Sequence, residues 1–146
     1  DNGIKLNVIG DLETLKNKPK SKLESIISET KNNKKLNLNL AISYGSKQEI
    51  VNVIREISNK VKNNIISSKN IDENIINEHL YTRNLPNVDL LIRTGGEKRV
   101  SNFLLWQIAY AEMYFTDLLW PDFKKEDFID ALDDYQKRDR RFGKIN

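Results

Sequence analysis

The chain has 146 residues, of which 38% are hydrophobic and 31% charged, with a formal net charge of +3 and no cysteine. This composition is typical of one soluble domain with a polar surface, and it excludes a disulfide framework and a thiolate metal site. No apolar run approaches the ~20 residues of a membrane span, and basic and aromatic residues do not interleave as nucleic-acid binding requires. We therefore expect no nucleic-acid partner, a cytoplasmic location and at most peripheral contact with a membrane.

The first half of the chain alternates strand and helix patterns. Residues 4–8 and 36–42 alternate apolar and polar side chains, which predicts two strands. Ser21 and Glu24 form a capping-box pattern that predicts a helix ending near residue 31. After a turn at residues 44–46, apolar residues recur at helical spacing and predict a second helix. Its apolar stripe consists of Ile50, Val53, Ile54, Ile57 and Val61.

The middle of the chain contains a linker, a short helix and a strand. Residues 63–70 are polar and predict a linker, after which Asp72 is placed to cap a short helix. Residues 85–87 predict a turn. The apolar run at residues 88–92 predicts a third strand in a buried, parallel position.

The last third begins with an apolar segment and ends with a polar helix. Residues 101–113 are unusually apolar and predict a helix buried on most sides, and residues 114–116 predict a short fourth strand. A Trp-Pro pair then interrupts the chain. Asp122 is placed to cap a last helix through about Arg141, and Gly143 is placed to end it.

Strand and helix patterns alternate along the whole chain. This order predicts a three-layer α/β fold with a mainly parallel sheet flanked by helices, formed by residues 1–146 as one domain. In such folds the ligand lies beyond the carboxyl ends of the strands. The segments that follow the second and third strands are therefore the candidate binding regions.

Basic and small polar residues crowd the segment after the third strand, residues 93–102, whose sequence is Arg-Thr-Gly-Gly-Glu-Lys-Arg-Val-Ser-Asn. Glycine allows close backbone approach, Ser101 suits the N-cap of the next helix, and arginine binds oxyanions in a bidentate manner. The segment therefore predicts a phosphate or diphosphate site. The alternative is a plain turn with solvated arginines. The Walker and dinucleotide-binding glycine patterns are both absent.

Glu112 is the one acid inside the predicted apolar helix. A buried carboxylate needs a cation, a metal or hydrogen-bond donors, and one carboxylate with substrate phosphates suits Mg²⁺; structural and functional roles both remain open. His79 predicts a surface or capping role, and the run 138–141 is placed to complement the dipole of the last helix. The aromatic residues predict a core or an interface; they are Phe103, Trp106, Tyr110, Tyr114, Phe115 and Trp120.

Taken together, these motifs resemble the cis-prenyltransferase family, in particular its bacterial undecaprenyl diphosphate synthase type. The match runs through residues 89–112 (Asp-Leu-Leu-Ile-Arg-Thr-Gly-Gly-Glu to Ala-Tyr-Ala-Glu) and 114–123. It continues in the Arg-Arg-Phe-Gly of residues 140–143, and earlier in Ile-Gly-Asp at 9–11 and Tyr-Gly at 44–45. It covers essentially the whole chain.

The resemblance implies a Mg²⁺-dependent transferase that condenses isopentenyl diphosphate onto farnesyl diphosphate to form undecaprenyl diphosphate, a lipid carrier for cell-wall glycans. It implies a homodimer, in which the Arg-x-Gly tail can reach the active site across the interface. It assigns Glu112 to Mg²⁺. It assigns isopentenyl diphosphate to a set of residues around the glycine loop and in the tail: Arg93, Arg99, Val100 and Ser101, extended by Gly95, Gly96, Lys98, Arg141 and Gly143.

The chain also departs from the family pattern. It starts at Asp1 rather than Met, which predicts a fragment or a processed product. The family's amino-terminal third, with its Asp-Gly-Asn-Gly-Arg loop and catalytic aspartate, is absent, so the resemblance implies that residues 1–146 are the carboxyl-terminal portion of a single cis-prenyltransferase domain. We therefore expect no catalytic residue within this chain and no turnover by it alone. Lys98 stands where many relatives have histidine, and Ser46-Lys47 replaces the commoner Gly-Arg. The alternatives are a non-catalytic prenyltransferase-like partner subunit and a generic diphosphate-binding α/β protein.

Overall fold

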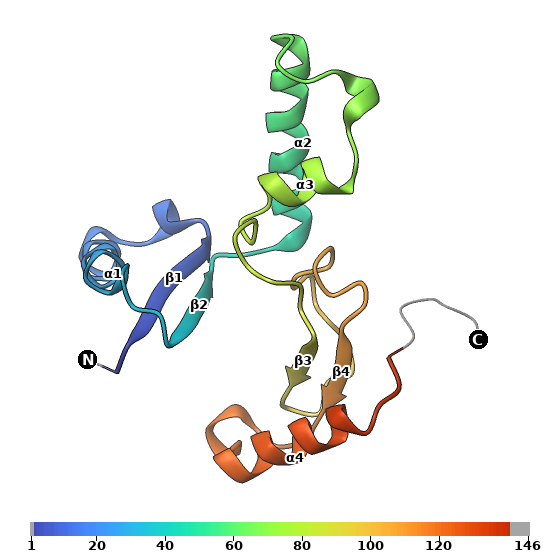
Figure 1. Ribbon diagram of the computed structural model, residues 1–146. Helices are drawn as coiled ribbons and strands as arrows, with labels where there is room; N and C mark the ends of the chain where they lie inside the picture. The colour runs from blue at the N-terminus through green and yellow to red at the C-terminus, as the bar shows by residue number, and fades with distance from the viewer. Residues whose placement is uncertain (1, 141–146) are drawn as a thin grey trace. The chain divides into compact units, whose positions relative to one another are not determined.

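Two compact units make up the chain, Asp1–Leu85 and Pro86–Asn146, and the computed structural model describes residues 2–140. Each unit pairs two parallel strands and packs one helix against them (Figure 1). The predicted α/β class and the parallel pairing are therefore confirmed. The strands form two separate two-stranded sheets, one in each unit, where the sequence predicted a single sheet.

The first unit follows the order strand, helix, strand, helix, helix. Its elements are β1 (Ile4–Gly10), α1 (Asn17–Thr30), β2 (Leu36–Ile42), α2 (Ser46–Lys62) and α3 (Glu73–His79). β1 and β2 pair in parallel with Ile4 opposite Leu36 and Gly10 opposite Ile42. α1 packs against β1, where the Thr30 hydroxyl accepts a hydrogen bond from the Leu6 N–H at 3.1 Å.

The buried face of α2 carries two polar residues that the apolar stripe did not predict. Ser46 and Glu49 are buried together with Val53 and Ile57, whereas Ile54 is 57% exposed. The four buried positions are spaced by three or four residues, which is one face of a helix. The predicted apolar stripe is therefore largely confirmed, since Val53 and Ile57 are buried and Ile50 and Val61 half-buried, but Ile54 does not belong to the buried face and Ser46 and Glu49 do.

Two of the predicted helix starts are wrong. α1 begins at Asn17, with Lys16 at the N-cap, and Ser21 donates to the Asn17 carbonyl from inside the helix. Pro19 is compatible with the earlier start because the first turn of a helix has no internal partner for its N–H groups. Asp122 belongs to a 3₁₀ turn instead of capping the last helix.

The second unit contains β3 (Leu90–Arg93), β4 (Glu112–Phe115) and α4 (Lys125–Gln136). β3 and β4 pair in parallel, with Leu90 opposite Glu112 and Arg93 opposite Phe115. The N-cap of α4 is Lys124, whose N–H donates to the Asp127 carboxylate at 2.6 Å. α4 ends at Gln136, so the helix is shorter than predicted; Gly143 lies outside the described residues.

The predicted helix over residues 101–113 is wrong. Residues 101–110 form successive turns and bends, and Glu112 and Met113 belong to β4. Ser101, Asn102 and Leu104 have φ angles of +47°, +63° and +47°. A right-handed helix cannot continue through the left-handed region, so Ser101 is not a helix N-cap.

Small apolar clusters stabilise each unit. The buried apolar side chains of the first unit are Leu6, Ile9, Val53, Ile57 and Leu80, and those of the second unit are Leu91, Ile108 and Ala131. None of the helices within residues 2–140 is long and apolar enough to cross a bilayer.

Candidate functional site

The basic loop begins at the carboxyl end of β3, where Arg93 folds back over it. The Arg93 guanidinium donates from Nη1 to the Ser101 hydroxyl at 3.0 Å and to the Arg99 carbonyl. The structure therefore brings together three residues that the sequence assigned to one anion site. These two hydrogen bonds of Arg93 close residues 93–101 into a loop.

The two glycines form the turn of this loop but their N–H groups do not point to an open site. Gly95 and Gly96 have φ angles of +87° and +77°, a region that favours glycine. Their N–H groups donate to the carbonyls of Leu118 and Thr116 at 2.7 and 2.9 Å. The chain after β4 thus shapes the glycine turn, and side chains of the loop must supply the contacts to an anion.

The remaining loop residues differ in how accessible they are. The Arg99 side chain is 61% exposed and forms an ion pair with Glu97. Lys98 is exposed, and Val100 is half-buried with its carbonyl accepting from the Phe103 N–H at 3.1 Å. Arg99, Lys98 and the Ser101 hydroxyl are therefore the groups that an incoming oxyanion can reach.

Glu112 lies at the other end of the same strand pair. It is the first residue of β4 and lies opposite Leu90, whereas Arg93 is the last residue of β3. Three residues of strand separate these levels, about 10 Å at about 3.3 Å per residue. The structure therefore does not bring Glu112 into the Arg93–Ser101 cluster, and Glu112 is on a strand rather than on the predicted helix.

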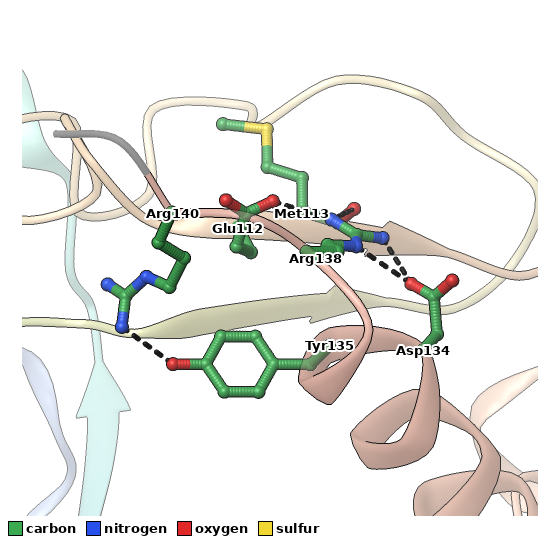
Figure 2. A network of polar contacts seen from close by, with 6 residues as sticks. All are labelled: Glu112, Met113, Asp134, Tyr135, Arg138 and Arg140. Carbon is green, nitrogen blue, oxygen red and sulfur yellow. Dashed lines mark hydrogen bonds and ion pairs between the residues drawn. The ribbon is translucent and has the colours of Figure 1, made fainter. Parts of the chain in front are cut away.

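Glu112 has a basic partner, Arg138, in the network of Figure 2. Arg138 Nη1 donates to Glu112 Oε2 at 2.9 Å and to the Met113 carbonyl at 3.0 Å. Arg138 Nε donates to Asp134 Oδ2 at 2.9 Å, and Nη2 binds the same oxygen. The hydrogen bonds to Glu112 and Asp134 raise the pKa of Arg138 above its usual value, so this guanidinium stays charged.

Arg140 forms a parallel connection to the other strand. Its Nη1 donates to Asp89 Oδ1 and to the Tyr135 hydroxyl, both at 2.7 Å, and the guanidinium lies 5.5 Å from the centroid of the Tyr135 ring. The hydrogen bond to Asp89 raises the pKa of Arg140. Arg138 and Arg140 therefore bind carboxylates next to β4 and β3, a specific role beyond the predicted complement to the helix dipole.

Sequence reasoning missed these arginine contacts. The spacing of Asp134 and Arg138, four residues apart near a helix end, was the available signal for one of them. Nothing local in the sequence links residue 138 to residue 112. Arg141 and Gly143, which the resemblance assigned to substrate, lie outside the described residues.

His79 is the last residue of α3 and is half-buried. Its Nδ1 lies 2.6 Å from the Ile75 carbonyl, as the predicted capping role requires, and its Nε2 lies 2.6 Å from Lys60 Nζ. A pocket of about 230 Å³ opens beside it within the first unit. Its lining is Glu49, Asn52, Val53, Arg55, Glu56, Asn59, His79 and Tyr81. Both charge signs are present, so the lining does not favour an anion.

The aromatic residues of the second unit are more exposed than a core role requires. Tyr110 is 68% exposed, Trp120 is 75% exposed and Phe103 is 40% exposed. Trp106, Tyr114 and Phe115 are half-buried. Trp120 stacks on Phe123 with 6.3 Å between ring centroids. Within residues 2–140, the predicted core role therefore does not apply to the three exposed rings.

The chain matches a family model described as putative undecaprenyl diphosphate synthase over residues 1–143. It is 50% identical over 142 residues to an isoprenyl transferase of Prochlorococcus marinus, with 97% of this chain and 52% of the relative covered. It is 45% identical over 140 residues to a ditrans,polycis-undecaprenyl-diphosphate synthase, farnesyl-diphosphate specific, of Photorhabdus laumondii, with 96% and 55% covered.

The chain is also similar to a prenyl diphosphate synthase of known structure. The chain superimposes with a TM-score of 0.93 and 39% identity on lavandulyl diphosphate synthase from Lavandula x intermedia, crystallised with dimethylallyl diphosphate. The match covers 97% of this chain and 61% of that one. The chain thus spans about half the length of the curated relatives it matches.

Proposed function

The chain belongs to the undecaprenyl diphosphate synthase family of cis-prenyltransferases, and on that premise we propose that its residues 93–101 bind the diphosphate of isopentenyl diphosphate. The complete protein that carries these residues would then condense isopentenyl diphosphate with an allylic diphosphate such as farnesyl diphosphate. Its product would be a long-chain cis-polyprenyl diphosphate of the undecaprenyl type. The new bond joins C1 of the allylic partner to C4 of the isopentenyl unit. The allylic carbon–oxygen bond breaks, its diphosphate leaves, and C2 of the isopentenyl unit loses a proton as the new double bond forms.

The closed basic loop is the observation that carries this proposal. Arg93 binds Ser101 and the Arg99 backbone at the carboxyl end of β3, the end at which parallel α/β sheets bind ligands. Charge-assisted hydrogen bonds to phosphate oxygens are about twice as strong as neutral ones. Arg93 therefore fixes the loop, while the exposed Arg99 and the Ser101 hydroxyl contact the diphosphate. Lys98 adds positive charge.

The ion pair between Arg99 and Glu97 has a consequence for binding. Both side chains are largely exposed, at 61% and 49%, so water weakens their attraction. A diphosphate carries more negative charge than one carboxylate and can replace Glu97 as the partner of Arg99. Glu97 then keeps Arg99 at the loop until substrate arrives.

For Mg²⁺ we propose Glu112 as the protein ligand. Glu112 Oε2 is held by Arg138, and Oε1 takes no hydrogen bond or ion pair within residues 2–140. One available carboxylate oxygen fits a Mg²⁺ ion whose other ligands are phosphate oxygens and water. Since about 10 Å of strand separates Glu112 from the basic loop, those phosphate oxygens would belong to the allylic diphosphate and not to the diphosphate bound by residues 93–101. No cluster of three or more acids or histidines within the described residues forms a metal site by itself. Bound Mg²⁺ would neutralise charge on a departing diphosphate.

We also propose that the complete protein is a homodimer. Tyr110 and Trp120 are 68% and 75% exposed in the second unit, as is the apolar Leu119 at 61%, and aromatic side chains are enriched at interfaces between subunits. Sedimentation of the complete protein with and without the Trp120→Ser substitution tests this. We expect the substitution to weaken the dimer; a monomeric parent protein would contradict the proposal.

Substitution of the loop arginine tests the diphosphate site. In the complete protein, Arg99→Ala removes a charge-assisted contact, so KM for isopentenyl diphosphate should rise about tenfold or more. Arg55 is an exposed arginine of the first unit, so Arg55→Ala is the matched control. It should leave KM unchanged for isopentenyl diphosphate and for farnesyl diphosphate. The assignment would be contradicted if Arg99→Ala weakened the binding of farnesyl diphosphate and left the binding of isopentenyl diphosphate unchanged.

A further inference from the structure

Glu49 is a carboxylate inside the core of the first unit. It is 2% exposed and shares the buried face of α2 with Ser46, Val53 and Ile57. Burying a carboxylate is unfavourable unless it is hydrogen-bonded, and apolar side chains of similar size are often more stabilising at such positions. The helix thus departs from its own apolar pattern at this residue. Departures of this kind concentrate at sites that serve function.

Two segments far apart in the sequence meet at this carboxylate. Glu49 Oε2 accepts a hydrogen bond from the Tyr44 hydroxyl at 2.6 Å, and Oε1 accepts one from the Tyr81 N–H at 2.7 Å. The rings of Tyr44 and Tyr81 meet edge to face, with 6.4 Å between centroids. Leu80, beside Tyr81, is 1% exposed. Glu49 therefore connects the turn after β2 to the segment after α3.

The turn that Glu49 fixes lies where a parallel sheet binds ligands. Tyr44 and Gly45 follow the carboxyl end of β2, and the Glu49 N–H donates to the Gly45 carbonyl at 3.0 Å. The side chain and the backbone of Glu49 thus hold the same turn from two directions. Since ligands of α/β sheets lie beyond these strand ends, the shape of this turn affects what binds there.

We propose that Glu49 is a positioning residue for prenyl diphosphate binding, which acts by fixing the Tyr44–Gly45 turn against Tyr81. This proposal rests on the function proposed above. Glu49 does not contact substrate. A glutamine has the same shape, but its Nε2 can only donate, so the Tyr44 hydroxyl would have to become an acceptor while Oε1 accepts from the Tyr81 N–H. Both hydrogen bonds would then lose the negative charge of the carboxylate, and charge-assisted hydrogen bonds are about twice as strong as neutral ones. The carboxylate therefore holds Tyr44 and Tyr81 more strongly than an amide of the same shape can.

The test measures kcat, KM for each diphosphate and the melting temperature of the complete protein. The variants are Glu49→Gln, Glu49→Asp and Tyr44→Phe, with Glu56→Gln as the control because Glu56 is an exposed acid on the same helix. We expect Glu49→Gln and Tyr44→Phe to raise KM for at least one of the two diphosphates about tenfold, the size of one hydrogen bond to a charged group. We expect kcat to stay within about twofold, since no group at the reacting atoms is changed. Glu49→Asp should fall between these variants and the parent.

Four outcomes would count against the proposals. A lower melting temperature with unchanged KM values would overturn it and make Glu49 a structural residue. A lower kcat with unchanged KM would also overturn it. Arg99→Ala is measured in parallel: if it raises KM for isopentenyl diphosphate and Glu49→Gln changes no KM, the positioning role fails and the diphosphate site stands. If Arg99→Ala has no effect, the proposed function itself fails.

Discussion

Arg138 Nη1 lies 2.9 Å from Glu112 Oε2, which joins the end of α4 to the first residue of β4. Both side chains are less than one-third exposed. Asp134 binds the same guanidinium from α4. The carboxylate that the sequence singled out therefore has a structural partner, and its residue is at the amino end of β4, whereas the basic loop follows the carboxyl end of β3.

The first prediction concerns the strength of this pair. A double-mutant cycle of Arg138→Gln and Glu112→Gln should give a coupling energy of about 1–2 kcal/mol, because the pair is partly shielded from water. Thermal or urea unfolding measures it. The pair Lys20–Glu13 is the control: the Lys20 side chain is 24% exposed, but the Glu13 side chain is 80% exposed, so this pair should couple more weakly. Equal coupling energies in the two cycles would show that partial shielding from water does not strengthen the Arg138–Glu112 pair.

The second prediction separates the two roles of Glu112. If Glu112 binds Mg²⁺, Glu112→Gln should lower turnover of the complete protein, and excess Mg²⁺ should partly restore it, because a neutral amide is a weaker ligand for a hard cation. If Glu112 serves only to hold Arg138, the melting temperature should fall while the Mg²⁺ dependence is unchanged. Arg138→Gln is the companion variant, since it disrupts the ion pair and leaves the carboxylate in place.

The third prediction concerns Gly10, at the end of β1. Its φ is +106°, and a Cβ there would lie 2.1 Å from the Ile42 carbonyl oxygen. Gly10→Ala should therefore destabilise the protein by more than the roughly 1–3 kcal/mol of backbone strain alone. Gly95→Ala is the matched control. Gly95 also has a positive φ, +87°, but a Cβ there would meet nothing within 4 Å, so we expect about 1–2 kcal/mol. Similar losses for both, measured by chemical unfolding, would refute the steric argument.

Sequence patterns were reliable where they reflect local chemistry. The second strand was predicted at its observed bounds because alternating leucine and asparagine specify a strand by period alone. Asp72 caps α3 through the Ile75 N–H at 2.9 Å as predicted, since a cap depends on residues three positions apart. The basic residues around Gly95 and Gly96 were likewise visible in one short segment.

The tertiary structure decided the features that depend on distant partners. The apolar residues 101–110 are not helical because the backbone at Ser101, Asn102 and Leu104 is left-handed, and composition carries no signal for that. The sequence did not predict that Glu49 is buried, because its partners, Tyr44 and Tyr81, come together only when α2 packs against the segment after α3. Glu112 and Arg138 are 26 residues apart. The sequence by itself determined which chemical groups are available and which segments have the period of a strand or a helix. Strand register and packing decided which of these groups meet, because they bring together residues that no local pattern connects.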